Sequence, residues 1–571
     1  QAPGAVPAPA PSPGPAPPIS VCYFTNWARY RSNLINKGKD VFEMGLNESL
    51  CTHFMYGFAT VKANGDIRSN DPNADHPGGH APQPCPTHCN DPNFVPDWSK
   101  PNGPRCDWPC TPGRAMRGYE GMNVGMKMQK PSIKTLISVG GWNFNDCSMT
   151  PQATYGQGSA TCEIFSSIAA TEAKSRSFAQ KAITFCRLWG FDGFDLDWEY
   201  PVVAGHNSNV KPFVDQQRDY ANYITLLRLM KEEFNAEAAA TGREPLLLTA
   251  AVGVGKATAE TAYDIPAMAQ QLDLINLMTY DLHGGWESVT GCNAPLYSTP
   301  EDQALAGYDL SVSWAVEYWL AQGVPPAKLT MGIATYGRGW KLADASNSGF
   351  NAPAAGKTAP GSSTGEAGYL AYYEVLDRIR AGATRVYDSQ RQCPYIVTGS
   401  GEWIGYDDFE SVQAKVNFAR SKGLRGTMVW ALDLDDFAGT YSGGTKYPLI
   451  SLMLGSGGPA PVPPPTQPPT APPTSNPSTP SPATPSPLVT PSPPVTPSPP
   501  VTPSPPVTPS PPATPSPQVS PSPVPGPLAC STCKQKCKDA CAGAWTQTNQ
   551  CWGTPRYIKC ECRDGTTHSF A

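Results

Sequence analysis

Eight short apolar runs, alternating with helical patterns between residues 19 and 455, constrain the fold of this 571-residue chain more than any other feature. Each run is rich in Val, Ile, Leu, Phe or Thr and bounded by Gly, Asp or Pro, which is typical of parallel strands buried on both faces. Helical patterns lie between them, for example at Gln216–Ala238. Eight such units in series predict an α/β fold, a (β/α)8 TIM barrel. The runs are Ile19–Thr25, Thr52–Ala59, Lys134–Gly140, Gly193–Trp198, Pro245–Val252, Asp273–Tyr280, Lys328–Thr335 and Gly426–Ala431.

Two connections between the predicted strands are unusually long. One covers residues 60–133 after the second run, and the other follows the seventh run. The second contains strand-like and helix-like patterns of its own at Tyr369–Ile379 and Tyr395–Ile404. Long loops in compact domains usually carry function. We therefore expect a small inserted α+β subdomain at about 340–424, forming one wall of the barrel mouth.

The ends of the chain differ in composition from the predicted barrel at 19–455. Residues 1–18 are almost entirely Pro, Ala, Gly, Ser and Val, and residues 456–527 repeat Val-Thr-Pro-Ser-Pro-Pro with close variants. Neither stretch has the large apolar residues that a core needs, so we expect a disordered tail and an extended linker. Residues 528–571 hold seven cysteines, which predicts a separate small disulfide-rich C-terminal domain with one cysteine left over.

Charge and cysteine usage exclude several classes of protein. The net charge is -5 with 16% charged residues, so the chain lacks the basic surface of a nucleic-acid-binding or membrane-surface protein. It has no apolar run of eighteen or more residues, so no segment is expected to span a membrane. Eighteen cysteines and a start at Gln1 indicate a processed protein of an oxidising compartment. We expect a secreted monomer, extracellular or in a cell wall.

An unusual run of acids begins at Asp192 and places four carboxylates within eight positions. In a strand, Asp195, Asp197 and Glu199 would share one face, while the apolar residues between them would face the other side. Crowding three acids raises carboxyl pKa values, which favours a general acid with carboxylate helpers over a polar strand edge or a calcium loop. Asp192 is out of phase with the others, so a structural role is the better interpretation. Active sites of barrels lie at the carboxyl ends of the strands, where Glu199 falls.

The segment Asp192-Gly-Phe-Asp-Leu-Asp-Trp-Glu199 resembles the D-x-x-D-x-D-x-E signature of glycoside hydrolase family 18 chitinases. The resemblance covers residues 19–455, and Gly365–Tyr373 is similar to the extra subdomain of the deep-grooved members. Other segments are similar in the same order, namely Tyr23–Trp27, Tyr56–Ala59, Ser138–Trp142, Met278–Asp281, Tyr336–Arg338 and Met428–Asp433.

The resemblance implies hydrolysis of β-1,4-linked N-acetylglucosamine with retention, using the substrate's acetamido group as nucleophile. Glu199 would be the general acid and then the base, Asp197 would orient the acetamido nitrogen, and Asp195 would share a proton with Asp197. Tyr280 would hold the acetamido carbonyl. The expected substrate-binding residues are Tyr23, Trp27, Phe58, Gly141, Trp142, Tyr200, Met278, Asp281, Trp286, Tyr336, Arg338 and Trp430, with Trp430 as the floor of the cleavage site. The partners would be chitin and chitooligosaccharides.

Other candidate sites have simpler explanations. The Cys85-x3-Cys89 and Cys106-x3-Cys110 pairs could bind zinc, but disulfides are favoured in an exported protein, so we expect no metal and no cofactor. The family pattern implies a bridge between Cys22 and Cys51. Cys186 lies in a helical apolar run and is expected to be a free core thiol, and His283 is either a cleft residue or a structural one. Asn47 begins an N-glycosylation sequon.

The C-terminal module carries Trp545, Trp552, Tyr557 and Phe570, which suits carbohydrate binding behind a tether, although a wall anchor or a protein-interaction knot fits its composition equally well. Two rivals to a chitinase remain for the barrel. One is a chitin-binding lectin on the same fold, which the presence of Glu199 disfavours. The other is an endo-β-N-acetylglucosaminidase acting on glycoproteins, which the aromatic strand ends and the insertion disfavour.

Overall fold

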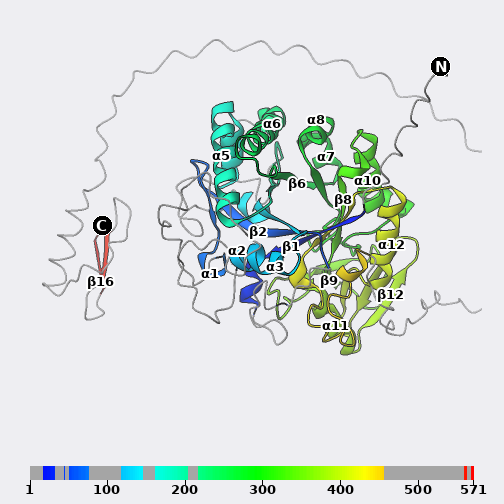
Figure 1. The fold of residues 1–571 in the computed structure, drawn as a ribbon. Helices are drawn as coiled ribbons and strands as arrows, with labels where there is room; N and C mark the ends of the chain where they lie inside the picture. Colours follow the sequence, from blue (N-terminus) through cyan, green and yellow to red (C-terminus); the bar gives the residue numbers. More distant parts are fainter. Residues whose placement is uncertain are drawn as a thin grey trace, which may run out of the picture. The chain divides into compact units, whose positions relative to one another are not determined.

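The computed structural model describes residues 17–31, 44, 50–75, 118–145, 161–203, 216–454, 558–561 and 567–570. Its main element is a parallel sheet in the order β1-β15-β8-β7-β6-β5-β4-β2, closed by pairing of β1 with β2 (Figure 1). The closed sheet confirms the predicted (β/α)8 barrel. The strands are β1 Ile19–Thr25, β2 His53–Val61, β4 Lys134–Gly140, β5 Gly193–Asp197, β6 Leu247–Gly253, β7 Leu274–Met278, β8 Leu329–Ala334 and β15 Gly426–Trp430.

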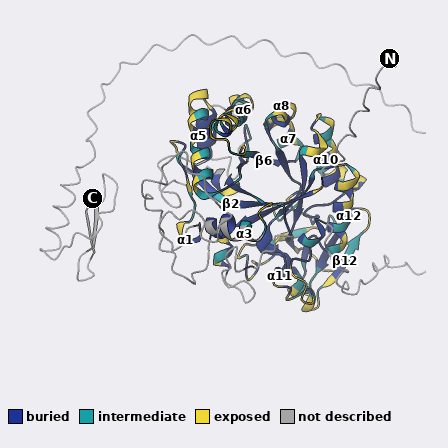
Figure 2. Ribbon diagram, in the orientation of Figure 1, coloured by how far each residue is buried: buried dark blue, intermediate teal, exposed yellow. Residues whose placement is uncertain are grey.

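All eight predicted runs overlap these strands, and two of them have the same bounds as the strand. The fifth run was expected to begin at Pro245, but β6 begins at Leu247. Proline has no backbone N–H to donate to the ladder, so it lies before the paired segment. Almost every strand residue is buried, because side chains fill the barrel on one face and helices cover the other (Figure 2).

The outer layer consists of helices whose exposed residues face away from the strands, as Figure 2 shows for α5, α6 and α10. α5 begins after the N-cap Thr171 and is followed by the C-cap Gly190, whose φ of 77° lets the chain turn into β5. The helices are α4 Ile164–Ala169, α5 Glu172–Trp189, α6 Gln216–Thr241, α7 Lys256–Ala262, α8 Ile265–Gln271, α9 Pro300–Ala306, α10 Val312–Ala321 and α12 Phe409–Ser421.

The insertion after β8 is an antiparallel sheet in the order β10-β9-β14-β13-β12, with β11 paired to β9 and one helix, α11. It has a small core of its own that includes Trp340 and Trp403, and Figure 1 shows α11 and β12 on the side of the barrel away from α5–α8. The elements are β9 Tyr336–Leu342, β10 Ala354–Lys357, β11 Tyr369–Ala371, α11 Tyr372–Arg380, β12 Thr384–Asp388, β13 Cys393–Val397 and β14 Glu402–Gly405.

The predicted α+β insertion is therefore present, but its extent differs from the expected 340–424. The antiparallel sheet already begins at Tyr336. At the other end, α12 contacts the barrel strands β8 and β15. This helix is the barrel helix between the last two strands, because its apolar face needs the barrel strands to cover it.

The remaining described elements are short. They are β3 Ile67–Ser69, α1 Pro72–Asp75, α2 Gly118–Glu120, α3 Met126–Gln129, the π-helical turn η3 Gly121–Gly125 and the 3-10 turns η1 Asn26–Tyr30, η4 Trp142–Asn145, η5 Thr161–Glu163, η7 Pro326–Lys328, η8 Leu432–Leu434 and η9 Ile450–Leu452. None of the described helices combines the length and hydrophobicity that crossing a bilayer requires. Beyond residue 475, in a second compact unit, β16 Ile558–Glu561 and β17 Thr567–Phe570 form an antiparallel pair.

Two disulfides link described cysteines. Cys22 and Cys51 are bonded, which confirms the pairing that the family resemblance implied, and Cys186 is a buried free thiol as expected. The second disulfide joins Cys292 to Cys393 and was not predicted. The Cys85, Cys89, Cys106 and Cys110 pairs, the Asn47 sequon and most of the C-terminal module lie outside the described residues.

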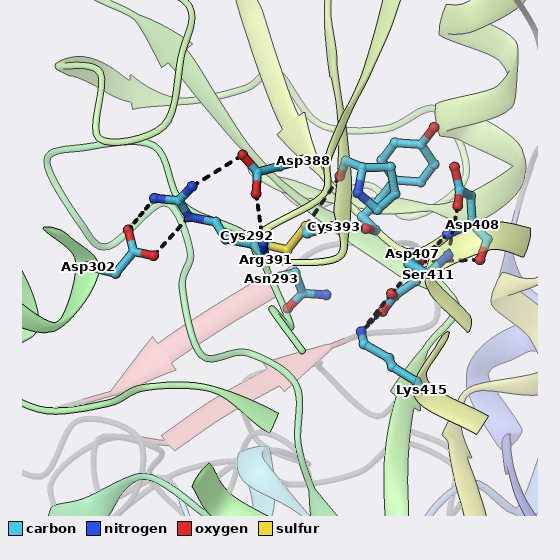
Figure 3. The surroundings of a disulfide bond; sticks show 12 residues. Cys292, Asn293, Asp302, Asp388, Arg391, Cys393, Asp407, Asp408, Ser411 and Lys415 are labelled. Atoms are coloured by element: carbon cyan, nitrogen blue, oxygen red, sulfur yellow. Dashed lines mark hydrogen bonds and ion pairs between the residues drawn. A yellow bond between two sulfur atoms is a disulfide. The ribbon is translucent and has the colours of Figure 1, made fainter. Parts of the chain in front are cut away.

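A buried ion pair joins the end of the insertion to α12. Lys415 Nζ lies 2.6 Å from both carboxylate oxygens of Asp407, and both side chains are almost fully buried (Figure 3). Lys415→Met leaves the Asp407 charge buried and unpaired, so we expect the free energy of unfolding to fall by about 3–5 kcal/mol. Chemical denaturation measures this loss.

The control is Lys256→Met, because Lys256 forms an ion pair with Glu260 on the surface of α7. Exposed pairs contribute little, so the control should stay within about 0.5 kcal/mol of the parent protein. Equal losses in the two variants would show that the buried pair has no special role.

Candidate active site

The acids of the run after Asp192 lie inside the barrel at its carboxyl end. Asp195 and Asp197 are on β5, and Glu199 follows two residues after the strand. All three are at most 8% exposed. The apolar residues that alternate with them point outward, where Phe194 packs edge-on against Phe178 of α5 with ring centroids 5.8 Å apart. The alternation predicted from the sequence is therefore present in the strand.

Asp195 is held by side chains from four other strands of the barrel, β1, β4, β6 and β7. Its Oδ2 accepts hydrogen bonds from Tyr23 and Ser138, both at 2.7 Å. Its Oδ1 accepts from Thr249 at 2.6 Å and from Asn276 at 3.3 Å. Burial raises the pKa of Asp195, while these four hydrogen bonds oppose the rise. The carboxylate is thus fixed in position at the centre of the barrel.

Asp197 lies between the other two acids and has a different environment. Its Oδ1 is buried and finds no hydrogen-bond partner among the described residues. Burial, the negative charge of Glu199 and that of Asp195, in this order, raise the pKa of Asp197 well above its usual range. A buried carboxyl oxygen without a donor is costly. Asp197 Oδ1 can therefore gain a proton or accept a hydrogen bond from a ligand.

Glu199 is the acid nearest the barrel mouth. Burial raises its pKa to about 8, a hydrogen bond from Tyr200 opposes the rise, and the negative charge of Asp281 adds to it. A carboxylic acid with such a pKa keeps its proton at neutral pH. This is the property that a general acid needs.

Tyr280 and Asp281 follow β7 and face residues of the insertion. Asp281 has a φ of 54°, and its backbone N–H donates to Asn293 Oδ1 at 2.9 Å. Asn293 in turn donates to the backbone oxygen of Tyr336 at 3.2 Å. One amide side chain thus fixes both the strand end that carries Asp281 and the start of β9. The Tyr336 hydroxyl is buried and finds no partner among the described residues.

Arg338 of β9 is the central cation of this side of the site. Its Nε lies 2.6 Å from Asp281 Oδ1. Its guanidinium also lies over three aromatic rings, at 5.3 Å from Trp286, 5.5 Å from Tyr336 and 4.8 Å from Tyr369. These contacts fix the orientation of the guanidinium plane. Trp286 nevertheless has 56% of its surface exposed.

A second group of aromatic residues comes from the ends of β1, β2 and β15. Phe58 and Trp430 are stacked with centroids 5.7 Å apart, and Trp27 stacks on Phe58 at 5.9 Å. Tyr23 lies 5.5 Å from Trp430, which places this group next to Asp195. Trp142 lies 6.5 Å from Tyr200 and is 45% exposed. Exposed rings of this kind offer flat apolar faces.

Gly141 and Met278 are two further residues that were predicted to belong to the site. Gly141 has a φ of 87°, and its N–H donates to the backbone oxygen of Asp197 at 2.9 Å. A Cβ at this position would lie 2.7 Å from the Phe58 ring, so only glycine fits. Met278 is the half-buried last residue of β7.

Asp192 and His283 contact groups other than the three acids. Asp192 accepts a hydrogen bond from the backbone N–H of Thr135 at 2.8 Å and pairs with Lys127 at 2.8 Å. The structural interpretation of Asp192 is therefore confirmed. His283 Nδ1 lies 3.1 Å from Glu287, within the loop that carries Trp286.

Sequence reasoning missed the residues that position the acids, namely Ser138, Thr249, Asn276, Asn293 and Tyr369. A signal was present for the first three, because each is a polar residue inside an otherwise apolar strand. Asn276 in the run Leu-Ile-Asn-Leu-Met is the clearest case. Asn293 has no such signal, since it lies in a loop. Among the described residues, no group of three or more His, Cys, Asp or Glu lies close enough to hold a metal ion.

Comparison with known proteins gives the class of this site. The sequence profile of the glycosyl hydrolases family 18 matches residues 19–435. A probable endochitinase of Caenorhabditis elegans is 37% identical over 439 residues, which are 76% of this chain and 59% of that protein. The chain therefore belongs to glycosyl hydrolases family 18, as the sequence resemblance indicated.

Solved structures agree with this class. The immunomodulatory active chitinase of Trichuris suis has a TM-score of 0.61 and 33% identity, covering 76% of this chain and 98% of that chain. A human pseudo-chitinase with retained chitooligosaccharide binding properties has a TM-score of 0.59 and 29% identity, covering 76% of this chain and 98% of that chain. The same fold thus occurs in chitinases and in a binding protein.

The raised pKa of Glu199 predicts a pH dependence of stability. In the unfolded chain this carboxyl titrates near 4.5, whereas in the folded protein it titrates at about 8. Between these values the folded protein holds a proton that the unfolded chain has released, so stability falls as the pH rises from about 4.5 to about 8. We expect Glu199→Gln to remove part of this slope, with a difference on the order of a few kcal/mol between the two ends.

Urea unfolding at pH 5 and pH 8 measures the slope. Glu260→Gln is the control, because Glu260 lies on the surface of α7 and, among the residues that the structure describes, forms a salt bridge only with Lys256. This control should keep the slope of the parent protein. A Glu199→Gln protein with the unchanged parental slope would contradict the raised pKa.

Proposed function

We propose that this protein is a chitinase that hydrolyses β-1,4 linkages between N-acetylglucosamine units by substrate-assisted, retaining catalysis. The observation that carries the proposal is the pairing of two acids with different environments. Glu199 has a pKa of about 8, and the adjacent Asp197 has a buried oxygen with no partner among the described residues. Pairs of carboxyls separated in this way define acid and helper roles.

In the first step, Glu199 protonates the glycosidic oxygen while the acetamido carbonyl oxygen of the substrate attacks the anomeric carbon. The bond to the leaving sugar breaks, and a cyclic oxazolinium ion forms. Asp197 accepts a hydrogen bond from the acetamido nitrogen through Oδ1 and stabilises the positive charge. Tyr280, whose hydroxyl lies 3.6 Å from Met428 Sδ at the barrel centre, holds the acetamido oxygen in line for attack.

In the second step, Glu199 is a carboxylate and removes a proton from water as the water attacks the anomeric carbon. The ring of the oxazolinium ion opens, the acetamido group is restored, and Glu199 regains its proton. Asp195 carries negative charge close to Asp197 and raises the pKa of Asp197. When no positive charge lies opposite Asp197, Asp195 therefore favours the protonated form of the Asp197 carboxyl.

The surroundings of the acids suit a neutral polymer of sugars. The aromatic groups around Trp430 and around Trp286 lie at strand ends, where their faces can stack on the apolar faces of pyranose rings. Asp281 and Arg338 offer an acceptor and donors for hydroxyl or acetamido groups. The relatives with chitinase activity in their names support this substrate class.

One observation supports the alternative that the protein is a lectin. The human pseudo-chitinase has this fold and binds chitooligosaccharides. The raised pKa of Glu199 favours catalysis, since binding alone does not need a protonated buried acid. An endo-β-N-acetylglucosaminidase would share the same acids, and it is disfavoured by the aromatic groups and the large insertion.

Glu199→Gln keeps the shape of the side chain and removes its proton. We expect the turnover number on chitohexaose to fall by about 10²–10⁴-fold, the usual contribution of a general acid, while the affinity for the oligosaccharide is retained. Product release measured by chromatography gives the rate, and calorimetry gives the affinity. Glu260→Gln is the control with the parental rate. If Glu199→Gln retained full turnover, the acid assignment would fail.

We also propose that the protein is secreted and that its C-terminal module binds chitin. The module follows a proline-rich linker and contains the strand pair β16 and β17. Deleting residues 457–571 should leave hydrolysis of soluble oligomers unchanged but reduce adsorption to crystalline chitin, because the module would otherwise hold the enzyme on the polymer. Sedimentation with chitin particles measures adsorption, and equal adsorption of both forms would favour the anchor role.

A further inference from the structure

Asn293 is a buried amide in the loop after β7, where the barrel meets the insertion, and it is only 1% exposed. Its side chain makes two hydrogen bonds of opposite kind. Oδ1 accepts from the backbone N–H of Asp281 at 2.9 Å, and Nδ2 donates to the backbone oxygen of Tyr336 at 3.2 Å. An N–H can only donate and a carbonyl oxygen can only accept, so the two partners give the amide a single orientation.

Asp281 has a backbone conformation that needs support from outside. Its φ of 54° lies in the left-handed region, which costs a residue with a side chain on the order of 1–3 kcal/mol. Asn293 holds two successive N–H groups at this point, because its side chain accepts from Asp281 and its backbone oxygen accepts from Leu282 at 2.9 Å. Without the side-chain bond, the Asp281 backbone can relax to a negative φ, and its carboxylate then points elsewhere.

The second partner of the amide supports Arg338. Tyr336 is the first residue of β9, and Arg338 lies two positions further along the same strand. By holding the Tyr336 oxygen, Asn293 fixes the strand end from which Arg338 Nε reaches Asp281 Oδ1 at 2.6 Å. Asn293 thus supports both members of this ion pair.

The backbone of Asn293 is itself firmly anchored. The preceding residue, Cys292, is bonded to Cys393 of β13 (Figure 3). The insertion sheet also lies directly against this stretch, since a Cβ on Gly405 of β14 would lie only 3.2 Å from the Cys292 Cα. Close packing and a covalent bond leave the loop little freedom to move. Asn293 is therefore a rigid support for Asp281.

The place of the Asp281 carboxylate matters for the proton donor. Burial raises the pKa of Glu199 to about 8, and the negative charge of Asp281 adds to the rise. Among the described residues, the titratable groups that face Glu199 are Asp197, Tyr200, Tyr263, Tyr280 and Asp281. The three tyrosines stay neutral at pH 8, because burial raises their pKa values well above 10. A change at Asn293 can therefore reach Glu199 through the charge of Asp281.

We propose that Asn293 is a positioning residue of the active site, which holds the Asp281 carboxylate close to both Arg338 and Glu199. The inference rests on the proposed chitinase function and adds to it a residue that acts only through the backbone of Asp281 and β9. The amide does not take part in proton transfer. It keeps a neighbouring charge in the place where that charge favours the protonated form of Glu199.

Asn293→Ala removes both hydrogen bonds of the amide. The value of kcat/KM for chitohexaose, measured between about pH 5 and about pH 10, has a basic limb that reports loss of the Glu199 proton. Once the Asp281 carboxylate leaves its place, its effect on Glu199 falls, so we expect this limb to move to lower pH by on the order of half a unit. At pH 5 we expect kcat/KM to fall by about tenfold, because the Asp281–Arg338 pair is displaced.

A double substitution shows whether the effect passes through Asp281. Asp281→Asn alone should also move the basic limb to lower pH, because it removes the charge. Adding Asn293→Ala to Asp281→Asn should then cause no further movement, since no carboxylate is left to displace. Asn293→Ser is a milder second variant with a side chain too short to reach both partners, and it should move the limb in the same direction.

Thr290→Val is the matched control in the same loop. The Thr290 hydroxyl also links this loop to the backbone of the insertion, donating to the Gly349 oxygen at 2.8 Å and accepting from the Ala352 N–H at 3.0 Å. It makes no contact with Asp281 among these bonds. We expect Thr290→Val to lose stability in chemical denaturation and to keep the parental pH profile.

A parental basic limb in both Asn293 variants would overturn the positioning role and leave the proposed function intact. A movement in Thr290→Val as large as that in Asn293→Ala would also overturn it, and so would an Asn293→Ala effect that persists undiminished in the Asp281→Asn protein. If the parent protein did not hydrolyse chitohexaose at any pH, the proposed function would fail, and this inference would fail with it.

Discussion

The fixed position of Asp195 is the constraint on which the rest of the site depends. Four side chains from β1, β4, β6 and β7 meet one buried carboxyl group, so the barrel must close in one register for all of them to reach it. A shift of any strand by one residue would turn its side chain to the other face. The cost of leaving this carboxyl unpaired would be several kcal/mol. The polar centre of the barrel thus specifies the arrangement of its apolar strands.

The polar centre of the barrel also explains why the three neighbouring acids have different surroundings. Asp195 accepts hydrogen bonds from four donors. Asp197 Oδ1 finds no donor among the described residues. Glu199 lies beyond the end of the strand and accepts a hydrogen bond from Tyr200. Burial raises the pKa of all three. Hydrogen bonds oppose this rise at Asp195 and Glu199, whereas the charges of Glu199 and Asp195 add to it at Asp197. The strand β5 and the two residues after it therefore carry a fixed carboxyl group and a proton donor four residues apart.

Much of the fold was predictable because the barrel depends on local, repeated patterns. The eight apolar runs and the alternation at 194–199 follow from strand geometry, and two runs matched their strands at both ends. The extent of the insertion was harder. α12 has the pattern of any amphipathic helix, and only its packing against β8 and β15 shows that it belongs to the barrel.

Long-range features of the site were not predictable in the same way. The Cys292–Cys393 bond and the role of Asn293 arise where segments far apart in the sequence meet. No local propensity encodes such meetings. The non-proline cis peptide bonds after Gly57, Glu199 and Trp430 also gave no sequence signal, since the trans form is favoured for such residues.

The Cys292–Cys393 disulfide has a consequence for how the molecule opens and how it is cut. It joins two residues that are 101 positions apart, and the segment between them includes β8, β9 and most of the insertion sheet. The bond therefore ties local opening of the insertion to movement of the neighbouring loop, where Asn293 holds Asp281. A protease that cleaved an insertion loop before Cys393, such as the one between β9 and β10, would leave two pieces joined by the bond. Under oxidising conditions, a nicked molecule would thus keep both sides of its cleft together.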